Sequence, residues 1–289
     1  MTPDSIALAN DRLEIEIAAQ GAELIRLRDA AGHDFLWNGD PQFWSGRAPL
    51  LFPMVGRAAA DRIKVGGRNY PLPQHGFARR RRFGIVLATP TTCVLRLEDD
   101  EETRAAFPYR FRLDVAFELR GPTLGIAATV SNTGDAPLPY SFGFHPAFRW
   151  PLPGGEGAHE LVFEHDETAP IRLLDDGLLA PEAVPNPVAG KRLRLKPDLF
   201  ARGALVFDRL ASRRVVYRAP GGPSLAVAFP DMPHLGLWTK PGAPFLCIEP
   251  WQGFAAPVGF DGEFAGRPGV VSLAPGARRV FAMEIDVGA

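Results

Sequence analysis

Two residues far apart in the chain have the types and the surroundings that acid–base chemistry needs. His145 lies in Pro139-Tyr-Ser-Phe-Gly-Phe-His-Pro-Ala-Phe-Arg-Trp150, among aromatic and small residues. Glu249 is the one carboxylate in the apolar run Phe245-Leu-Cys-Ile-Glu-Pro-Trp-Gln252. Burial raises the pKa of a carboxyl towards the range in which it serves as a general base. We therefore predict that His145 and Glu249 face each other across a cleft as an acid and a base.

Both residues also have a purely structural interpretation. Glu249 could be an edge-strand residue whose strand ends at Pro250, or half of a buried Arg–Glu pair. A single histidine is often a surface residue or a satisfied core residue. We apply that interpretation to the histidines in polar turn regions, which are His33, His159 and His165. His75 and His145 differ because Gly, Pro and aromatic residues surround them, and a buried polar group needs a partner.

Several cationic and aromatic residues could bind a ligand. Residues 79–82 are four consecutive arginines and could form a phosphate-binding patch. On a strand, however, two of them would be solvated and two packed, because side chains alternate between faces. Arg57 could simply end a strand as a surface charge. Trp238 and Trp251 flank Glu249 and could stack on a sugar, although tryptophans are more often core residues.

Other chemistries lack their motifs in this sequence. No two of the six histidines have the close spacing of a metal site such as His-Glu-x-x-His, so we expect no metal. Cys93 and Cys247 both lie in apolar runs, and we interpret them as two buried thiols. The sequence also has no Gly-rich phosphate loop, Gly-x-Ser-x-Gly nucleophile turn or dinucleotide fingerprint.

The overall charge and hydropathy exclude further classes of partner. Lys and Arg number 32 against 33 Asp and Glu, so nothing favours binding to nucleic acid. The first 13 residues lack a basic segment followed by an apolar one, which argues against a signal peptide. No run approaches the roughly 20 apolar residues of a membrane helix. We therefore expect a cytoplasmic protein that does not bind membranes.

The elements that must position the candidate residues are strands. The clearest occupies residues 109–119, where large apolar side chains alternate with polar or small ones. Gly121 and Pro122 interrupt it, and the alternation resumes over residues 124–130, which predicts an antiparallel hairpin. Similar short strands are expected at residues 13–17, 23–27, 192–195, 204–207, 214–217, 225–229 and 280–287. Residues 99–106, with an acidic first turn, predict one short helix.

The intervening segments predict the fold class. Residues 37–56 and 70–83 are rich in Gly, Pro and aromatics without a period, which is typical of loops that place functional groups. The 30 glycines and 29 prolines recur throughout, so we expect a single domain over residues 1–289. Many short strands with regularly spaced turns predict an all-β protein, a large antiparallel β-sandwich.

At these residues the chain resembles the aldose 1-epimerase (galactose mutarotase-like) family, most nearly its short bacterial members. The matching segments, in the family's order, are Pro49-Leu-Leu-Phe-Pro-Met-Val-Gly-Arg57, Gln74-His-Gly-Phe-Ala-Arg79, Ser141-Phe-Gly-Phe-His-Pro-Ala-Phe148, Leu235-Gly-Leu-Trp-Thr-Lys-Pro241 and Cys247-Ile-Glu-Pro-Trp251. The resemblance implies a supersandwich of antiparallel strands, a sugar substrate, and catalysis without cofactor or metal. We expect a monomer or a homodimer.

The resemblance also implies roles for individual residues. Glu249 resembles the family's general base and His145 its general acid. His75 resembles the histidine that hydrogen-bonds the sugar near its ring oxygen, and Arg57 the arginine that holds a hydroxyl. Further substrate-binding candidates are Trp238 and Arg79. One departure concerns the aspartate that family members usually direct at the sugar hydroxyls, for which this sequence offers only Asp208, a weak candidate.

These roles imply a cofactor-independent isomerase, a mutarotase acting on a free aldose. The anomeric hydroxyl loses a proton, the ring oxygen gains one, and the opened ring recloses on the other face. A carboxylate and an imidazolium tuned near working pH can run this in both directions. Three alternatives stay open. They are a hexose-6-phosphate mutarotase with Arg79 at the phosphate, a non-catalytic sugar-binding or regulatory protein, and a lyase or hydrolase, for which no second carboxylate motif is found near Glu249.

Overall fold

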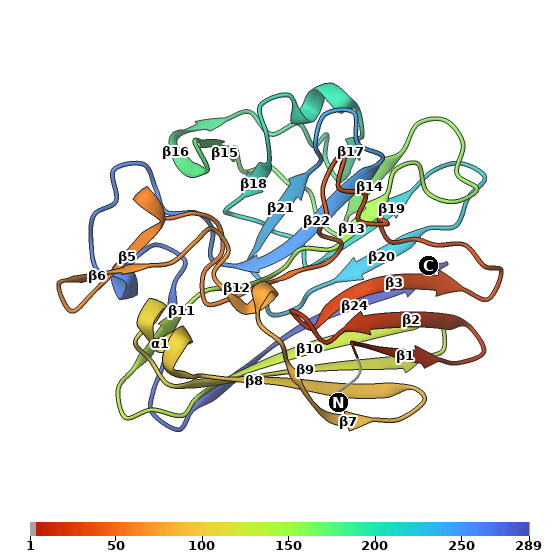
Figure 1. Ribbon diagram of the computed structural model, residues 1–289. Coiled ribbons are helices and arrows are strands. Elements are labelled where there is room, and N and C mark those ends of the chain that lie inside the picture. The colour runs from red at the N-terminus through yellow and green to blue at the C-terminus, as the bar shows by residue number, and fades with distance from the viewer. Residues whose placement is uncertain (1–3, 289) are drawn as a thin grey trace.

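The computed structural model describes residues 4–288, and antiparallel strands are its main regular secondary structure (Figure 1). Its largest sheet has nine strands, in the spatial order β17 (Arg192–Arg194), β14 (Glu160–Phe163), β19 (Arg214–Arg218), β20 (Leu225–Ala228), β24 (Arg278–Val287), β10 (Thr123–Asn132), β9 (Phe111–Arg120), β8 (Thr92–Glu98) and β7 (Gly84–Ala88). The all-β antiparallel fold predicted from the sequence is confirmed.

A second sheet of eight strands contains Glu249, and His145 directly follows one of its strands. Its order is β16 (Leu178–Val184), β15 (Ile171–Asp175), β18 (Leu205–Phe207), β21 (His234–Trp238), β22 (Phe245–Gln252), β12 (Phe142–Phe144) and β4 (Leu50–Leu51), with β13 (Ala147–Arg149) also paired to β22. Figure 1 shows β21 and β22 crossing above the long strands of the nine-stranded sheet.

Three small sheets complete the strand set. They are β1 (Ser5–Ala9), β2 (Leu13–Ala18) and β3 (Glu23–Asp29); β5 (Arg62–Val65) with β6 (Arg68–Pro71); and β11 (Leu138–Tyr140) with β23 (Val271–Leu273). None of the helices in the described residues is long and apolar enough to cross a membrane.

The main core forms where the predicted alternation buries one face of each strand. In the β9–β10 hairpin, Phe117 lies opposite Ile126 and Leu119 opposite Leu124, and all four side chains are buried. Alternate side chains point to opposite faces of a strand, so the intervening charged residues of β9 reach the outside. The hairpin predicted from residues 109–130 is confirmed.

Local capping explains the one α-helix, α1 (Glu101–Ala106), which begins two residues later than predicted. The Asp100 carboxylate accepts a hydrogen bond from the backbone N–H of Thr103, and the Thr103 hydroxyl accepts one from the N–H of Asp100. This capping box satisfies two donors at the helix start. Short 3₁₀ turns also occur at η1 (Ala59–Asp61), η2 (Ala78–Arg80), η3 (Pro197–Phe200) and η4 (Phe264–Gly266).

The arginine run at residues 79–82 does not lie on a strand, so the two-face arrangement considered for it was wrong. Turn η2 covers Ala78–Arg80 and sends consecutive side chains in different directions. Arg81 forms ion pairs with Asp100 and Glu102 beside α1. Arg79, in contrast, lines the cavity described below.

Candidate active site

Strand β22 carries Glu249 on a face different from the one that builds the main core. Leu246 and Ile248 belong to the core between the large sheets. Cys247, Glu249 and Trp251 alternate with them and therefore share the opposite face. All eight residues of β22 are buried, which is why the sequence reads as an apolar run. Glu249 is the one acidic or basic residue in this buried strand.

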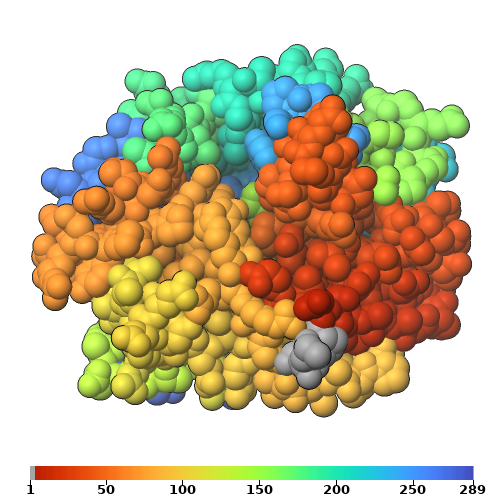
Figure 2. Space-filling model, viewed as in Figure 1, coloured from red at the N-terminus to blue at the C-terminus, as the bar shows by residue number. Residues whose placement is uncertain are grey.

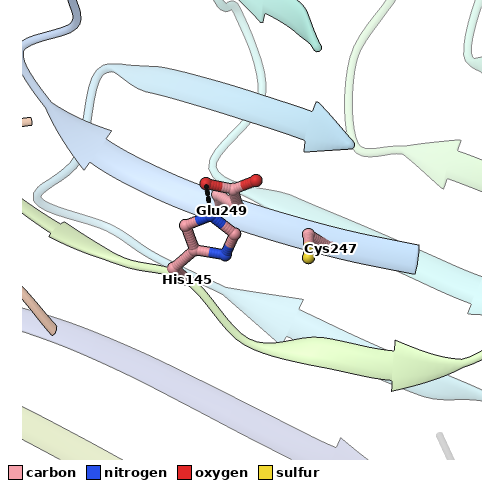
Figure 3. Close-up of side chains that lie close together, drawn as sticks. All are labelled: His145, Cys247 and Glu249. Carbon is pink, nitrogen blue, oxygen red and sulfur yellow. Dashed lines mark ion pairs between the residues drawn. The ribbon is translucent and has the colours of Figure 1, made fainter. Parts of the chain in front are cut away.

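His145 reaches Glu249 through the register of the strands. Strands β12 and β13 both pair with β22, and His145 lies in the connection between them. The flanking register pairs are Gly143 with Trp251 and Ala147 with Cys247. His145 therefore occupies the position across from Glu249, and its Nε2 lies 3.1 Å from Oε2 of that residue (Figure 3). The structure brings the two predicted residues together.

Burial opposes the charged form of both groups. It raises the pKa of Glu249 well above its usual value, with the nearby Trp251 indole acting in the opposite direction. Burial also lowers the pKa of His145 to about 3, and the charge of Arg79 adds to that effect. Within residues 4–288, His145 Nδ1 has no hydrogen-bond partner, and Glu249 Oε2 has its 3.1 Å contact with His145 Nε2 but accepts no other bond. The pair thus has polar atoms available to a ligand.

A cavity of about 520 Å³ opens over this pair. Its lining includes His75, Arg79, His145, Trp238 and Glu249, which are five of the six site residues predicted from the sequence. Further lining residues are Trp44, Gly56, Gln74, Leu174, Gly177, Arg202, Gly203, Ala204, Val206, Trp251 and Ala255. A cavity of this size with a few polar groups among apolar walls is typical of a small-molecule site.

The segment around Trp44 forms one wall of the cavity. The Trp44 ring lies 4.9 Å from the His145 ring and 5.6 Å, edge to face, from that of Trp238. Lys240 holds this segment by donating to the carbonyl oxygen of Phe43 at 2.9 Å. In Figure 2 the same segment is the orange-red lobe that projects against blue atoms of the later strands. Sequence reasoning placed functional groups in this loop but did not select Trp44.

His75 is held with one ring nitrogen turned to the backbone. Its ring Nδ1 accepts a hydrogen bond from the backbone N–H of Gly56 at 3.1 Å. The backbone N–H of His75 donates to the carbonyl of Gly56 at 2.8 Å. Burial, followed by the charge of a protonated His145 and of Arg79, lowers the pKa of His75 well below its usual value. An accepting Nδ1 on a neutral ring means that the proton sits on Nε2. That Nε2 lies 3.3 Å from the side-chain amide of Gln74, a residue that also lines the cavity.

Arg79 is a half-buried cation on the same cavity. It donates to the carbonyl of Gln74 at 3.0 Å, and burial together with the charge of Arg80 lowers its pKa to about 10. Arg202 lines the cavity as well. Among the described lining residues Glu249 is the one carboxylate. The cavity therefore has an excess of positive charge.

Two residues predicted from the sequence lie outside the lining. Arg57 forms ion pairs with Asp61 at 3.0 Å and with Asp176 at 3.2 Å. Asp208 lies 3.4 Å from the guanidinium of Arg172 and is largely buried. Both side chains therefore lie in ion pairs, and neither Arg57 nor Asp208 is among the cavity-lining residues.

The floor of the cavity depends on a residue that sequence reasoning missed. Arg267 is 3% exposed, and its Nη2 donates to the carbonyls of Val55 at 2.7 Å and Phe254 at 2.6 Å. The residues that follow these carbonyls, Gly56 and Ala255, line the cavity. No motif surrounds Arg267 in the sequence, so nothing local signals this role.

Comparisons with known proteins agree with this fold. The sequence profile described as aldose 1-epimerase matches residues 4–264. Two LacX proteins of Lactococcus lactis subsp. lactis, one chromosomal and one plasmid-encoded, are each 30% identical over 284 residues, covering 94% of this chain and 95% of the relative.

Solved structures extend the comparison to the whole fold. A galactose mutarotase-like protein from Lactobacillus casei ATCC 334 superposes with a TM-score of 0.92 at 28% identity, covering 98% of this chain and 99% of that one. A galactose mutarotase related enzyme from Lactobacillus acidophilus gives the same TM-score and identity, covering 99% and 97%. Galactose 1-epimerase from Lactobacillus acidophilus NCFM shares the fold, with a TM-score of 0.71 at 15% identity and coverage of 98% and 93%.

Proposed function

This chain belongs to the aldose 1-epimerase family, and we propose that it is a mutarotase for a free aldose, with Glu249 as base and His145 as acid. The observation that carries the proposal is the 3.1 Å contact between His145 Nε2 and Glu249 Oε2 at a cavity large enough for a monosaccharide. Mutarotation needs one group that removes a proton from the anomeric hydroxyl and one that protonates the ring oxygen. The pair supplies both.

The pair can act because it shares one proton. Burial favours a neutral imidazole beside a protonated carboxyl. Transfer of that proton to His145 creates a carboxylate and an imidazolium in contact, and each charge stabilises the other at this distance. Sugar hydroxyls that hydrogen-bond to the carboxylate of Glu249 favour this ionised form further. In that form Glu249 accepts the anomeric proton while His145 donates to the ring oxygen.

The remaining residues hold the sugar. We assign the Nε2–H of His75, a tautomer fixed by the N–H of Gly56, to a hydrogen bond with the sugar near its ring oxygen, which would replace the 3.3 Å contact with the Gln74 amide. Trp44, Trp238 and Trp251 provide aromatic walls. Arg57 is the weakest of the assignments, since its guanidinium would have to leave Asp61 and Asp176 to hold a hydroxyl.

Mutarotation assays test the proposal directly. Polarimetry or exchange NMR on freshly dissolved α-glucose and α-galactose should show faster equilibration with the protein than in buffer. Glu249→Gln and His145→Asn should each lose about 10²–10⁴-fold of that rate, the usual worth of one acid–base group. The matched controls Glu118→Gln and His33→Asn change exposed residues and should keep it.

Two results would contradict the proposal. Variants at Glu249 and His145 that equilibrate anomers as fast as wild type would show that the site assignment is wrong. A wild-type protein that never outpaces buffer on any aldose would favour the sugar-binding or regulatory alternative.

A hexose 6-phosphate is the second candidate substrate. The observation that favours it is the positive charge of the cavity, where Arg79 and Arg202 accompany a single carboxyl, that of Glu249, whose pKa is raised by burial. Arginine binds phosphate through charge-assisted hydrogen bonds. The same acid–base chemistry would apply, because the anomeric centre is unchanged.

We also propose that residues 1–289 form one domain. The main hydrophobic core is a single cluster that includes Ile6 near one end and Val287 near the other. A domain is defined by such a core of its own.

A further inference from the structure

Cys247 brings a third chemically active side chain to the candidate acid–base pair. It lies two residues before Glu249 on β22, so both side chains emerge on the same face of the strand. One ligand atom from each of His145, Cys247 and Glu249 can be chosen so that all three lie within 4.8 Å of one another. In Figure 3 the dashed line joins His145 and Glu249, and Cys247 lies further along the strand that carries Glu249.

The three side chains are buried and not committed to other partners. Cys247 is a free thiol. Oε2 of Glu249 contacts Nε2 of His145 at 3.1 Å and accepts no hydrogen bond from residues 4–288. An ion bound between these two atoms would ligate both of them. His145 and Glu249 line the cavity, which gives a small ion a route to them.

The donor set and the spacing suit a thiophilic divalent cation. Zinc binds imidazole nitrogen, thiolate sulfur and carboxylate oxygen at about 2.0–2.3 Å, which places tetrahedral ligand atoms about 3.3–3.8 Å apart. The 3.1 Å between His145 Nε2 and Glu249 Oε2 is already close to that spacing. The three ligand atoms lie within 4.8 Å of one another, so ion binding requires Cys247, which packs against Trp37, Ala147 and Phe245, to move towards the pair. Three protein ligands leave a fourth position for water.

We propose that His145, Cys247 and Glu249 bind a thiophilic divalent cation, with zinc as the ion that best fits their donors, and that the bound ion inhibits the protein. Binding displaces the thiol proton and the carboxyl proton and requires no oxidation or reduction. Thiolate and carboxylate together balance the charge of the ion, which offsets repulsion from Arg79. The binding claim stands on geometry alone, whereas the inhibition claim rests on the proposed function.

A spectroscopic experiment tests binding without any activity assay. Co²⁺ added to the full-length protein should produce a thiolate-to-cobalt charge-transfer band in the near ultraviolet. Cys247→Ser should abolish the band. Cys93→Ser is the matched control, because Cys93 is also a buried free thiol but lies on β8 in the main core. Absence of the band in wild type, or its persistence in Cys247→Ser, would overturn the proposal.

A kinetic experiment tests inhibition. Zinc should slow mutarotation by the wild-type protein, and a chelator should restore the rate. With inhibition expressed relative to each protein's own zinc-free rate, Cys247→Ser should need at least about tenfold more zinc than wild type for half-inhibition. Equal zinc sensitivity of wild type and Cys247→Ser would refute inhibition at this site. If no variant catalyses mutarotation, the proposed function fails while the cobalt result still decides the binding claim.

Discussion

His145 lies directly across a β-ladder from Glu249, in the gap between two strands that both pair with β22. The pairing of Gly143 with Trp251 and of Ala147 with Cys247 places the backbone of His145 across from Glu249. An acid and a base joined in this way are positioned by sheet hydrogen bonds instead of by a mobile loop. Rigid elements hold catalytic groups more accurately than loops do.

The buried carboxyl of Glu249 should reduce stability at neutral and alkaline pH. Its folded-state pKa lies above the unfolded value near 4.5, so the folded protein binds the proton more tightly. The stability cost of ionising it is absent below the unfolded pKa and grows as pH rises towards the folded pKa. Glu249→Gln removes that cost, and we expect it to raise the free energy of unfolding by about 1–3 kcal/mol at pH 8 and by much less at pH 4.5.

Melting temperatures across this pH range provide the measurement for Glu249→Gln. Glu118→Gln, at an exposed position, should show no comparable pH trend. A Glu249→Gln protein that melts below wild type at pH 8 would contradict the predicted burial cost.

Gly236 and Gly143 should tolerate no side chain, because the Trp251 indole lies over both. A Cβ at Gly236 would come within 2.3 Å of the Trp251 ring, and a Cβ at Gly143 within 2.5 Å. Gly236→Ala should push the indole towards the cavity, destabilise the fold by about 1–3 kcal/mol and raise KM. Gly266→Ala is the control, since nothing lies within 4 Å of the added atom. Thermal melts and sugar kinetics compare the two, and equal behaviour would exclude this packing role.

Arg267 should act as a positioning residue for the cavity floor. Arg267→Met leaves the carbonyls of Val55 and Phe254 without their donor, at a cost of about 1–3 kcal/mol for each buried group. Movement of Gly56 would also disturb His75, so we expect KM for the sugar to rise along with the loss of thermal stability. Exposed Arg68→Met provides the comparison. Unchanged KM in a destabilised Arg267→Met protein would leave Arg267 a purely structural residue.

Arg79 should distinguish the two candidate substrates. If the substrate is a hexose 6-phosphate, Arg79→Gln should raise KM for it by about 10–100-fold, the worth of one charge-assisted hydrogen bond. The KM for the neutral hexose should change little. Arg80→Gln alters the next residue, which is exposed, and should affect neither substrate. An equal effect of Arg79→Gln on both sugars would argue against a phosphate subsite.

Much of the fold could be predicted because its causes are local. Alternation over residues 109–130 sets which side chains face the core, and the break at Gly121 and Pro122 sets the turn. The Asp100–Thr103 capping box specifies α1 within two residues of its predicted start. The apolar residues that surround His145 and Glu249 in the sequence also predict that both are buried polar groups.

Which residues lie beside His145 and Glu249 depends on the tertiary structure. Period-two alternation assigns a side chain to a face of a strand, but it does not say which distant strand lies alongside. Only the register of β22 with its neighbours places His145 beside Glu249 and Cys247 near both. The η2 turn, the ion pairs of Arg57 and the burial of Arg267 likewise arise from contacts between segments remote in the chain. The sequence by itself determined the chemistry available to this protein, and non-local strand pairing decided which groups meet.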